Sequence, residues 1–266
     1  MLKRVSTALV LAAIGFPAIY YGGIFFWGLI TLLLVIAAWE YLSLMRSAGY
    51  QPAIRLGVAG VFFLALVRTY FPDYESATLI FFIFLAMAHH LLAFERGRDE
   101  AASDFAFTLT GLVYLGWMGA YLIRLRELPN GVYWFSFVLP IIWFTDTGAF
   151  FVGRKWGKHK LAPRLSPKKT WEGYFGGVFF GLLGSLLFYT LWHQILNISL
   201  FDSLLLGLSL SVLTPLGDLG ESMIKRQSGI KDSSHILPGH GGIFDRIDTW
   251  LWAAPLGYYL VRWFFI

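Results

Sequence analysis

The sequence predicts an all-α, polytopic integral membrane protein with about nine transmembrane helices and a cytoplasmic N-terminus. Its 266 residues are 57% hydrophobic and only 14% charged, far more apolar than an ordinary soluble domain. The apolar residues gather in long runs, and no polar stretch between them is long enough to form a soluble domain. The chain contains no cysteine, which excludes disulfides, thiolate catalysis and cysteine-based zinc sites.

Nine apolar runs account for the predicted helices. In chain order they cover residues 5–21, 24–44, 56–71, 78–94, 105–123, 132–152, 173–195, 200–224 and 247–266. Lys3 and Arg4 before the first run could begin a signal peptide, but no small-residue cleavage site follows and the next run starts almost at once. We therefore expect a single membrane domain, with N-terminal helices over residues 1–130 and a C-terminal region over residues 131–266 that carries the chemistry.

Some residues within the runs have structural interpretations. Glu40 stands near the end of the second run. His89 and His90 lie in a run with no nearby acid, and we expect them to be packed or hydrogen-bonded between helices. A series of glycines at roughly helical spacing indicates close packing of neighbouring helices, because small residues let helices approach each other. These glycines are Gly173, Gly176, Gly177, Gly181 and Gly184.

The distribution of Lys and Arg predicts the orientation. With a cytoplasmic N-terminus, 21 basic residues divide so that only four lie outside the cytoplasmic segments, namely Arg68, Arg124, Arg126 and Arg262. The loops 153–172 and 225–246 then lie together on the cytoplasmic side, where nucleotides are available. A net charge of +5 suits anionic lipids and anionic substrates, and nucleic acid is not an expected partner.

Four aspartates lie at or near the cytoplasmic ends of predicted helices. They are Asp146, Asp218, Asp245 and Asp248. Ionisable residues at membrane depth are costly and indicate a functional site. Converging carboxylates repel one another unless a cation lies between them, and oxygen ligands without cysteine favour Mg²⁺. Asp218 and Glu221 are three residues apart, so they share a helix face.

The alternative for each acid is a local ion pair, such as Asp245 with Lys231 or Asp218 with Lys225. The basic residues also have two interpretations. Lysines beside hydroxyl residues at a helix start, as in the segment 166–170, resemble a phosphate-binding site. The same lysines would equally serve as a cytoplasmic anchor that attracts anionic lipid.

The segment from Ser222 to Asp248 carries a family resemblance. It reads SMIKR, four residues, KD, four residues, and LPGHGGIFDRID. Throughout its length it resembles the signature of the phosphatidate cytidylyltransferase family, also called CDP-diacylglycerol synthases. The segments 166–170 and 146–148 look like further motifs of that family, whereas the N-terminal half matches only in being hydrophobic.

The resemblance implies transfer of the cytidylyl group of CTP to phosphatidic acid, giving CDP-diacylglycerol and pyrophosphate in phospholipid biosynthesis. It implies an enzyme of the bacterial cytoplasmic (inner) membrane with its active site facing the cytoplasm, Mg²⁺ as cofactor, room for a second cation, and compatibility with a homodimer. The expected metal ligands are Asp218, Asp245, Asp248 and Asp146. The expected catalytic residues are Asp218, Asp245, Asp248, Lys225 and Arg226. The expected substrate-binding residues are Ser166, Lys168, Lys169, Thr170, Lys231, Asp232, His240, Gly241, Gly242 and Arg246.

Two other functions fit parts of the pattern. A CTP-dependent polyprenol kinase would use a similar membrane site but would transfer the γ-phosphoryl group. A secondary transporter would also place acids within the membrane, but it needs broken helices near the midplane in two related halves. Here the polar residues cluster in the last half of the chain and at one face.

Overall fold

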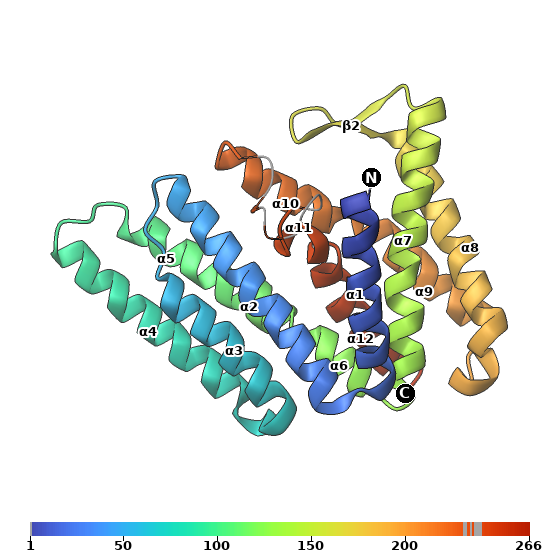
Figure 1. The fold of residues 1–266 in the computed structure, drawn as a ribbon, viewed down its shortest axis with the longest axis horizontal. Coiled ribbons are helices and arrows are strands. Elements are labelled where there is room, and N and C mark those ends of the chain that lie inside the picture. Colours follow the sequence, from blue (N-terminus) through green and yellow to red (C-terminus); the bar gives the residue numbers. More distant parts are fainter. Residues whose placement is uncertain (1, 231–232, 235, 237–240) are drawn as a thin grey trace. The chain divides into compact units, whose positions relative to one another are not determined.

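The computed structural model describes residues 2–230, 233–234, 236 and 241–266, with backbone only for residues 2–8, and most of them are helical (Figure 1). The predicted all-α class is confirmed, with one small two-stranded hairpin as the exception. The helices of the N-terminal half are α1 (Leu2–Tyr21), α2 (Gly23–Ser47), α3 (Ile54–Tyr70), η1 (Pro72–Tyr74), α4 (Glu75–Glu95), α5 (Ala101–Thr110), the π-helical η2 (Gly111–Met118) and α6 (Tyr121–Glu127). Those of the C-terminal half are α7 (Gly131–Trp156), α8 (Trp171–Leu196), α9 (Leu200–Leu213), α10 (Pro215–Gln227), α11 (Phe244–Ile247) and α12 (Trp250–Phe264).

Six helical stretches within the described residues are long and apolar enough to cross a membrane. They are Gly23–Ser47, Pro72–Glu95, Ala101–Glu127, Gly131–Trp156, Trp171–Leu196 and Leu200–Gln227. Each coincides with a predicted apolar run. The chain is therefore an integral membrane protein, because helices of this length and composition match the hydrocarbon thickness of a bilayer.

The other three predicted runs also form helices, which are not among these six stretches. Helix α3 has 17 residues and α12 has 15. Helix α1 has 20 residues, and within the part of it whose side chains the structure describes, the apolar stretch is Leu9–Tyr21. About 20 residues are needed to cross the hydrocarbon core without adjustment of the bilayer or the helix. The structure thus supports six spans by length and composition, and the count of nine and the cytoplasmic N-terminus stay predictions.

The chain divides into two units, each held together by its own packing. The first unit comprises residues 1–124 and 224–247, and the second comprises residues 125–223 and 248–266. The described residues between 224 and 247 thus belong with the N-terminal helices, although they lie in the C-terminal half of the chain. The division therefore passes through helix α10 and through the signature segment.

In the first unit, α2, α3, α4 and the stretch from α5 to η2 lie side by side (Figure 1). Buried leucines fill the space between them, among them Leu34, Leu64 and Leu112. His90 on α4 is buried, and its Nε2 lies 3.0 Å from Oγ1 of Thr108 on α5. This hydrogen bond between helices confirms the structural interpretation of His90.

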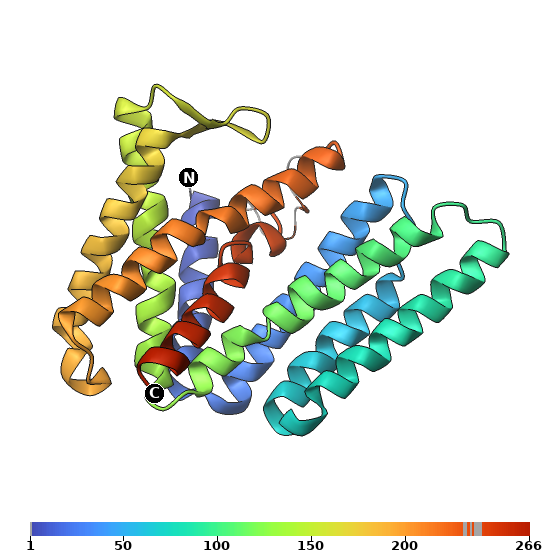
Figure 2. The same cartoon turned by 180° about the vertical axis from the view of Figure 1, so that it is seen from behind.

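In the second unit, α7 and α8 form the most extensive helix pair, and α9 packs against α8 (Figure 2). The glycines of α8 allow this approach. A Cβ at Gly173 would come within 2.9 Å of the Ala149 carbonyl oxygen, and one at Gly177 within 2.8 Å of the Thr145 carbonyl oxygen. The glycine series therefore serves helix packing, as the sequence predicts.

A β-hairpin extends beyond the ends of α7 and α8 (Figure 2), where the sequence indicates only a basic loop. Its antiparallel strands are β1 (Lys160–Ala162) and β2 (Ser166–Thr170). The hydroxyl of Thr170 accepts a hydrogen bond from the backbone N–H of Gly173 at 3.1 Å and so caps helix α8. The Glu172 carboxylate accepts the backbone N–H groups of Lys158 and His159, which ties the start of the hairpin to the same helix end.

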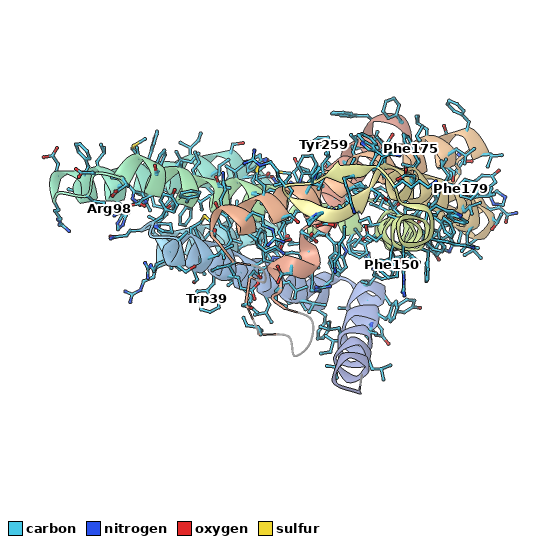
Figure 3. All side chains as sticks on the ribbon, turned by 90° about the horizontal axis from the view of Figure 1, so that it is seen from above. Trp39, Arg98, Phe150, Phe175, Phe179 and Tyr259 are labelled. Carbon is cyan, nitrogen blue, oxygen red and sulfur yellow. The ribbon has the colours of Figure 1, made fainter. Side chains whose placement is uncertain are left out.

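Large apolar side chains project from the outer surfaces of α7 and α8 (Figure 3). Phe150, Phe175 and Phe179 are 59%, 64% and 59% exposed. A soluble monomer rarely exposes a continuous apolar surface of this kind. We therefore expect this apolar surface to face the acyl chains of lipids.

Candidate active site

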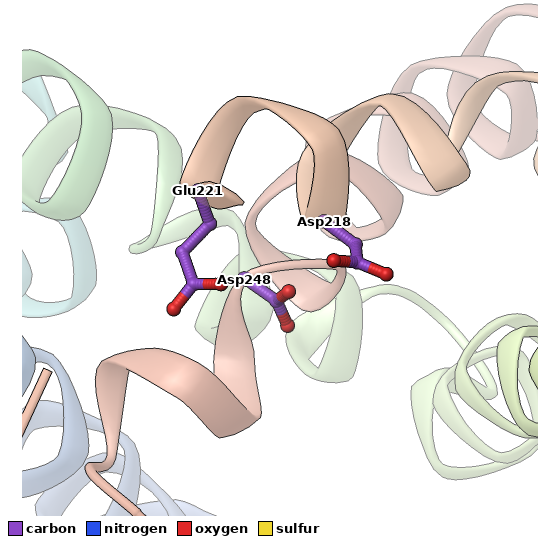
Figure 4. Close-up of side chains that lie close together, drawn as sticks. All are labelled: Asp218, Glu221 and Asp248. Atoms are coloured by element: carbon purple, nitrogen blue, oxygen red, sulfur yellow. The ribbon is translucent and has the colours of Figure 1, made fainter. Parts of the chain in front are cut away.

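Three carboxylates of the second unit come together at the start of α10 (Figure 4). Asp218 and Glu221 extend from one face of α10, and Asp248 lies in the short connection between α11 and α12. One oxygen of each lies within 4.8 Å of the corresponding oxygens of the other two. Glu221 and Asp248 are buried, while Asp218 is partly exposed. We call this group the carboxylate cluster.

Gly217 makes the carboxylate cluster possible. A Cβ at this position would lie 2.8 Å from the carbonyl oxygen of Asp248 and 2.8 Å from Cδ1 of Trp252. The absence of a side chain lets the first turn of α10 approach the chain before α12. That approach brings two acids of one helix to a third acid 27 or more residues further along the chain.

A lysine of the hairpin meets the carboxylate cluster. Lys169 Nζ lies 2.5 Å from Oδ2 of Asp218, an ion pair that the sequence did not suggest. Asp146 on α7 is exposed and lies within electrostatic range of Asp218 and Lys169, although it is not part of the cluster. The second unit therefore combines acidic oxygen donors with a primary ammonium group.

Asp245 is held in a different way, inside the first unit. Its Oδ1 accepts from Lys225 Nζ at 2.9 Å, and its Oδ2 accepts from the backbone N–H groups of Ser233 at 3.0 Å and Gly242 at 2.9 Å. Gly241 has a φ of 81°, and a Cβ there would lie 2.7 Å from Oδ2 of Asp245. Both oxygens of Asp245 are thus engaged by the signature segment itself.

These contacts order the loop, because one carboxylate accepts hydrogen bonds from an ammonium group and from two backbone N–H groups. The same carboxylate would be available to a metal only if it exchanged some of these partners. The sequence suggested Lys231 as the local partner of Asp245, and Lys231 lies outside the described residues. The ion pair that the structure shows is with Lys225.

Comparison with known proteins decides the family. Residues 2–264 match the model of the Cytidylyltransferase family. The chain belongs to this family. Proteins named phosphatidate cytidylyltransferase are similar to it over nearly their whole length. One from Staphylococcus saprophyticus is 34% identical over 259 residues, covering 96% of this chain and 97% of that protein. One from Staphylococcus epidermidis is 36% identical over 265 residues, with 96% and 97% covered, and one from Synechocystis is 31% identical over 289 residues, with 97% and 96% covered.

As a member of the cytidylyltransferase family, the chain can be compared with the site expected from its signature. The structure brings together Asp218, Asp248 and Lys169, and it places Lys225 on Asp245. Lys168, Arg226 and Arg246 are exposed and Ser166 is partly exposed, while Lys231, Asp232 and His240 lie outside the described residues.

Two residues of the carboxylate cluster or next to it, Glu221 and Gly217, were not predicted from the sequence to be site residues. Glu221 was recognised as sharing a face with Asp218, and that spacing was the signal that it belongs with the acids. Gly217 gave no local signal, because the need for glycine there arises from a distant carbonyl group. A third residue, Glu40, is wholly buried beside the signature segment.

Proposed function

We propose that the protein is a magnesium-dependent phosphatidate cytidylyltransferase. It transfers the cytidylyl group of CTP to phosphatidic acid, giving CDP-diacylglycerol and pyrophosphate in phospholipid biosynthesis. The observation that carries the proposal is the carboxylate cluster beside Lys169, in a chain of the cytidylyltransferase family. Relatives of nearly equal length bear the name of this activity.

The carboxylate cluster fits a magnesium ion. It offers three carboxylate oxygens as ligands, two of them from buried residues, and no sulfur or nitrogen ligand belongs to the group. Asp218, Glu221 and Asp248 would hold the ion, and bound Mg²⁺ would offset the negative charge of the phosphate groups. Asp146 as a ligand and any second cation stay predictions that a metal titration decides, and we expect Asp245 to order the signature segment instead.

The reaction needs two anions to meet. An oxygen of the phosphatidate phosphate forms a bond to the α-phosphorus of CTP, in line with the bond that breaks. That bond joins the α-phosphorus to the oxygen leading to the β-phosphate, and pyrophosphate leaves with its electron pair. No covalent nucleophile of the protein is required, so the chain's task is to position the substrates and to lower their repulsion.

The chain's own cations perform part of that task. Lys169 is already drawn to the carboxylate cluster, so its ammonium group is placed to contact a phosphate oxygen bound there. Lys168 precedes it on β2 with an exposed side chain. The hairpin leads directly into α8, which places both lysines near headgroup depth and favours the phosphate of the lipid as their partner.

The setting of the reaction follows from the membrane. We place the enzyme in the cytoplasmic (inner) membrane of a bacterium, with the hairpin and the signature segment on the cytoplasmic side, in keeping with the bias of basic residues. Phosphatidic acid enters from the bilayer and keeps its acyl chains in hydrocarbon. A homodimer is compatible with this reading.

The position of a radioactive label tests the function. Purified protein is incubated with phosphatidic acid, Mg²⁺ and CTP labelled at either the α- or the γ-phosphate. We expect the α-label in CDP-diacylglycerol and the γ-label in released pyrophosphate, with both lost when Mg²⁺ is chelated. Transfer of the γ-label to a polyprenol would support the kinase alternative, and no consumption of CTP would contradict both enzymes.

A further inference from the structure

Glu40 is a carboxylate that nothing in the proposed chemistry uses. It lies on α2, within a predicted membrane span, and its exposed fraction is 0%. An isolated buried charge is costly unless hydrogen bonds or an opposite charge compensate it. The hydrogen-bond partners of Glu40 therefore indicate its role.

All of the described partners of Glu40 come from the signature segment. Oε2 accepts the backbone N–H of Phe244 at 2.7 Å and faces the Ser233 hydroxyl at 3.4 Å. Oε1 accepts the backbone N–H of Ile243 at 3.1 Å and the Ser234 hydroxyl at 2.5 Å. These donors are 193 to 204 residues away from Glu40 in the chain.

The hydrogen bonds fasten two separate points of the signature segment to one carboxylate. Ser233 and Ser234 precede Gly241 and Gly242 in the chain, and Ile243 and Phe244 follow them. The partners donate four hydrogen bonds, and within the described part of the chain none of them carries a positive charge. A carboxylate can accept all four, whereas the amide of glutamine would turn two donors of its own towards them.

Gly242 shows how closely the carboxylate fits. A Cβ at Gly242 would lie 2.7 Å and 2.8 Å from the two carboxylate oxygens of Glu40. The backbone N–H of the same glycine donates to Asp245, so Glu40 and Asp245 enclose this turn from two sides. The phenyl ring of Phe244 also packs edge-on against Tyr41, the neighbour of Glu40 on α2.

We propose that Glu40 is a positioning residue for CTP binding, which keeps the Gly241–Gly242 turn and Asp245 in their working conformation. This inference rests on the proposed function, because it assigns the signature segment to the nucleotide. It also gives the N-terminal half of the chain a part in the reaction, although no motif of the family resemblance lies there. Glu40 contacts no substrate and acts through the backbone of the segment.

The first test compares Glu40→Gln with Asp104→Asn. Asp104 is the control, since it is also 0% exposed, lies in the same unit and accepts the backbone N–H of Gln51 at 2.6 Å, although it also forms an ion pair with Arg98. Each variant is assayed per folded molecule, after its folded fraction and Tm are measured. We expect E40Q to raise the KM for CTP or to lower kcat/KM for CTP at least about tenfold, as loss of bonds to a charged acceptor would.

The KM for phosphatidic acid should change less than about twofold in E40Q, and D104N should lower Tm while keeping both KM values. A merely structural Glu40 would behave like Asp104. Wild-type kcat and KM values in folded E40Q would overturn the proposal. If E40Q does not accumulate as folded protein, Ser234→Ala replaces it, because this variant removes one donor and leaves the carboxylate in place.

Hydrogen exchange gives a readout that does not depend on activity. The amides of Ile243 and Phe244 should exchange faster in E40Q or in Ser234→Ala, while they stay as in the wild type in D104N. Unchanged exchange at both amides would overturn the positioning role even if activity fell. A wild-type protein that made no CDP-diacylglycerol would instead reject the proposed function, whatever the exchange data showed.

Discussion

At the residue scale, the acids of the signature and its surroundings divide into two kinds of environment. Asp218, Glu221 and Asp248 lie together with Lys169 nearby, whereas Asp245 is surrounded by backbone N–H groups and Lys225. Carboxylates that face one another favour a cation, and a carboxylate that faces several donors favours an ordered loop. Substitution by the matching amide distinguishes the two, since it preserves shape and removes charge.

We expect Glu221→Gln and Asp248→Asn to lower kcat about a hundredfold, the scale of one lost electrostatic contact to a transition state, and to raise the Mg²⁺ concentration needed for half-maximal rate. Asp245→Asn should lower the rate without changing that Mg²⁺ requirement. The measurement is initial rate against free Mg²⁺ for each folded variant. Asp202→Asn is the control, because Asp202 only caps α9 at the far end of the Leu200–Gln227 stretch. A shifted requirement in D245N would make Asp245 a ligand.

At the element scale, the start of α10 depends on a glycine that permits contact with the chain before α12. Gly217→Ala would place a methyl group 2.8 Å from the Asp248 carbonyl oxygen, and backbone atoms cannot move aside easily. We expect Gly217→Ala to lower both the Tm and the activity. Gly220→Ala on the same helix is the matched control, since no atom lies within 4 Å of its Cβ position and alanine favours helix. Equal Tm and equal activity in the two variants would contradict this account.

The hairpin gives a second prediction at this scale. Lys169 pairs with Asp218, whereas the Lys168 side chain is exposed, so the two lysines should not contribute equally. Lys169→Arg should lower kcat/KM severalfold or more, because a planar guanidinium does not replace a compact ammonium group, and Lys168→Arg should have a smaller effect. Membrane insertion should be normal in both.

The substrate whose KM rises identifies the phosphate that the hairpin holds, and we expect phosphatidic acid rather than CTP. A topological anchor needs only positive charge in the cytoplasm. Wild-type kinetics in a Lys168→Arg, Lys169→Arg double variant would therefore leave the anchor as the sole role of these lysines.

At the scale of the whole molecule, the orientation in the membrane can be tested directly because the chain has no cysteine. Single cysteines replace Ser166 in the hairpin, Gln227 at the end of α10, and Asp73 in η1. We expect labelling of the first two only from the cytoplasmic side of sealed vesicles, and of the third only from the opposite side. Labelling of Ser166→Cys from outside would reject the cytoplasmic active site, and a cytoplasmic Asp73→Cys would reject the count of nine spans.

Local pattern was sufficient for the class of the protein. Hydrophobic length predicts membrane helices because crossing a bilayer is a property of each segment alone, and six of the expected runs satisfy it. The glycine series of α8 and the family signature could likewise be read along the chain. The length of α12 could not, because its run begins at residue 247 whereas the helix begins only at Trp250, after α11 and a short connection.

The partners of each charged side chain were decided only by tertiary structure. Asp218 pairs with Lys169 of the hairpin, and Glu40 accepts a hydrogen bond from Phe244, which lies 204 residues further along the chain. Residue type and spacing specify which groups can form an ion pair or bind a metal. Which ones do so depends on how distant segments pack, since a buried carboxylate takes whichever donors the packing brings to it.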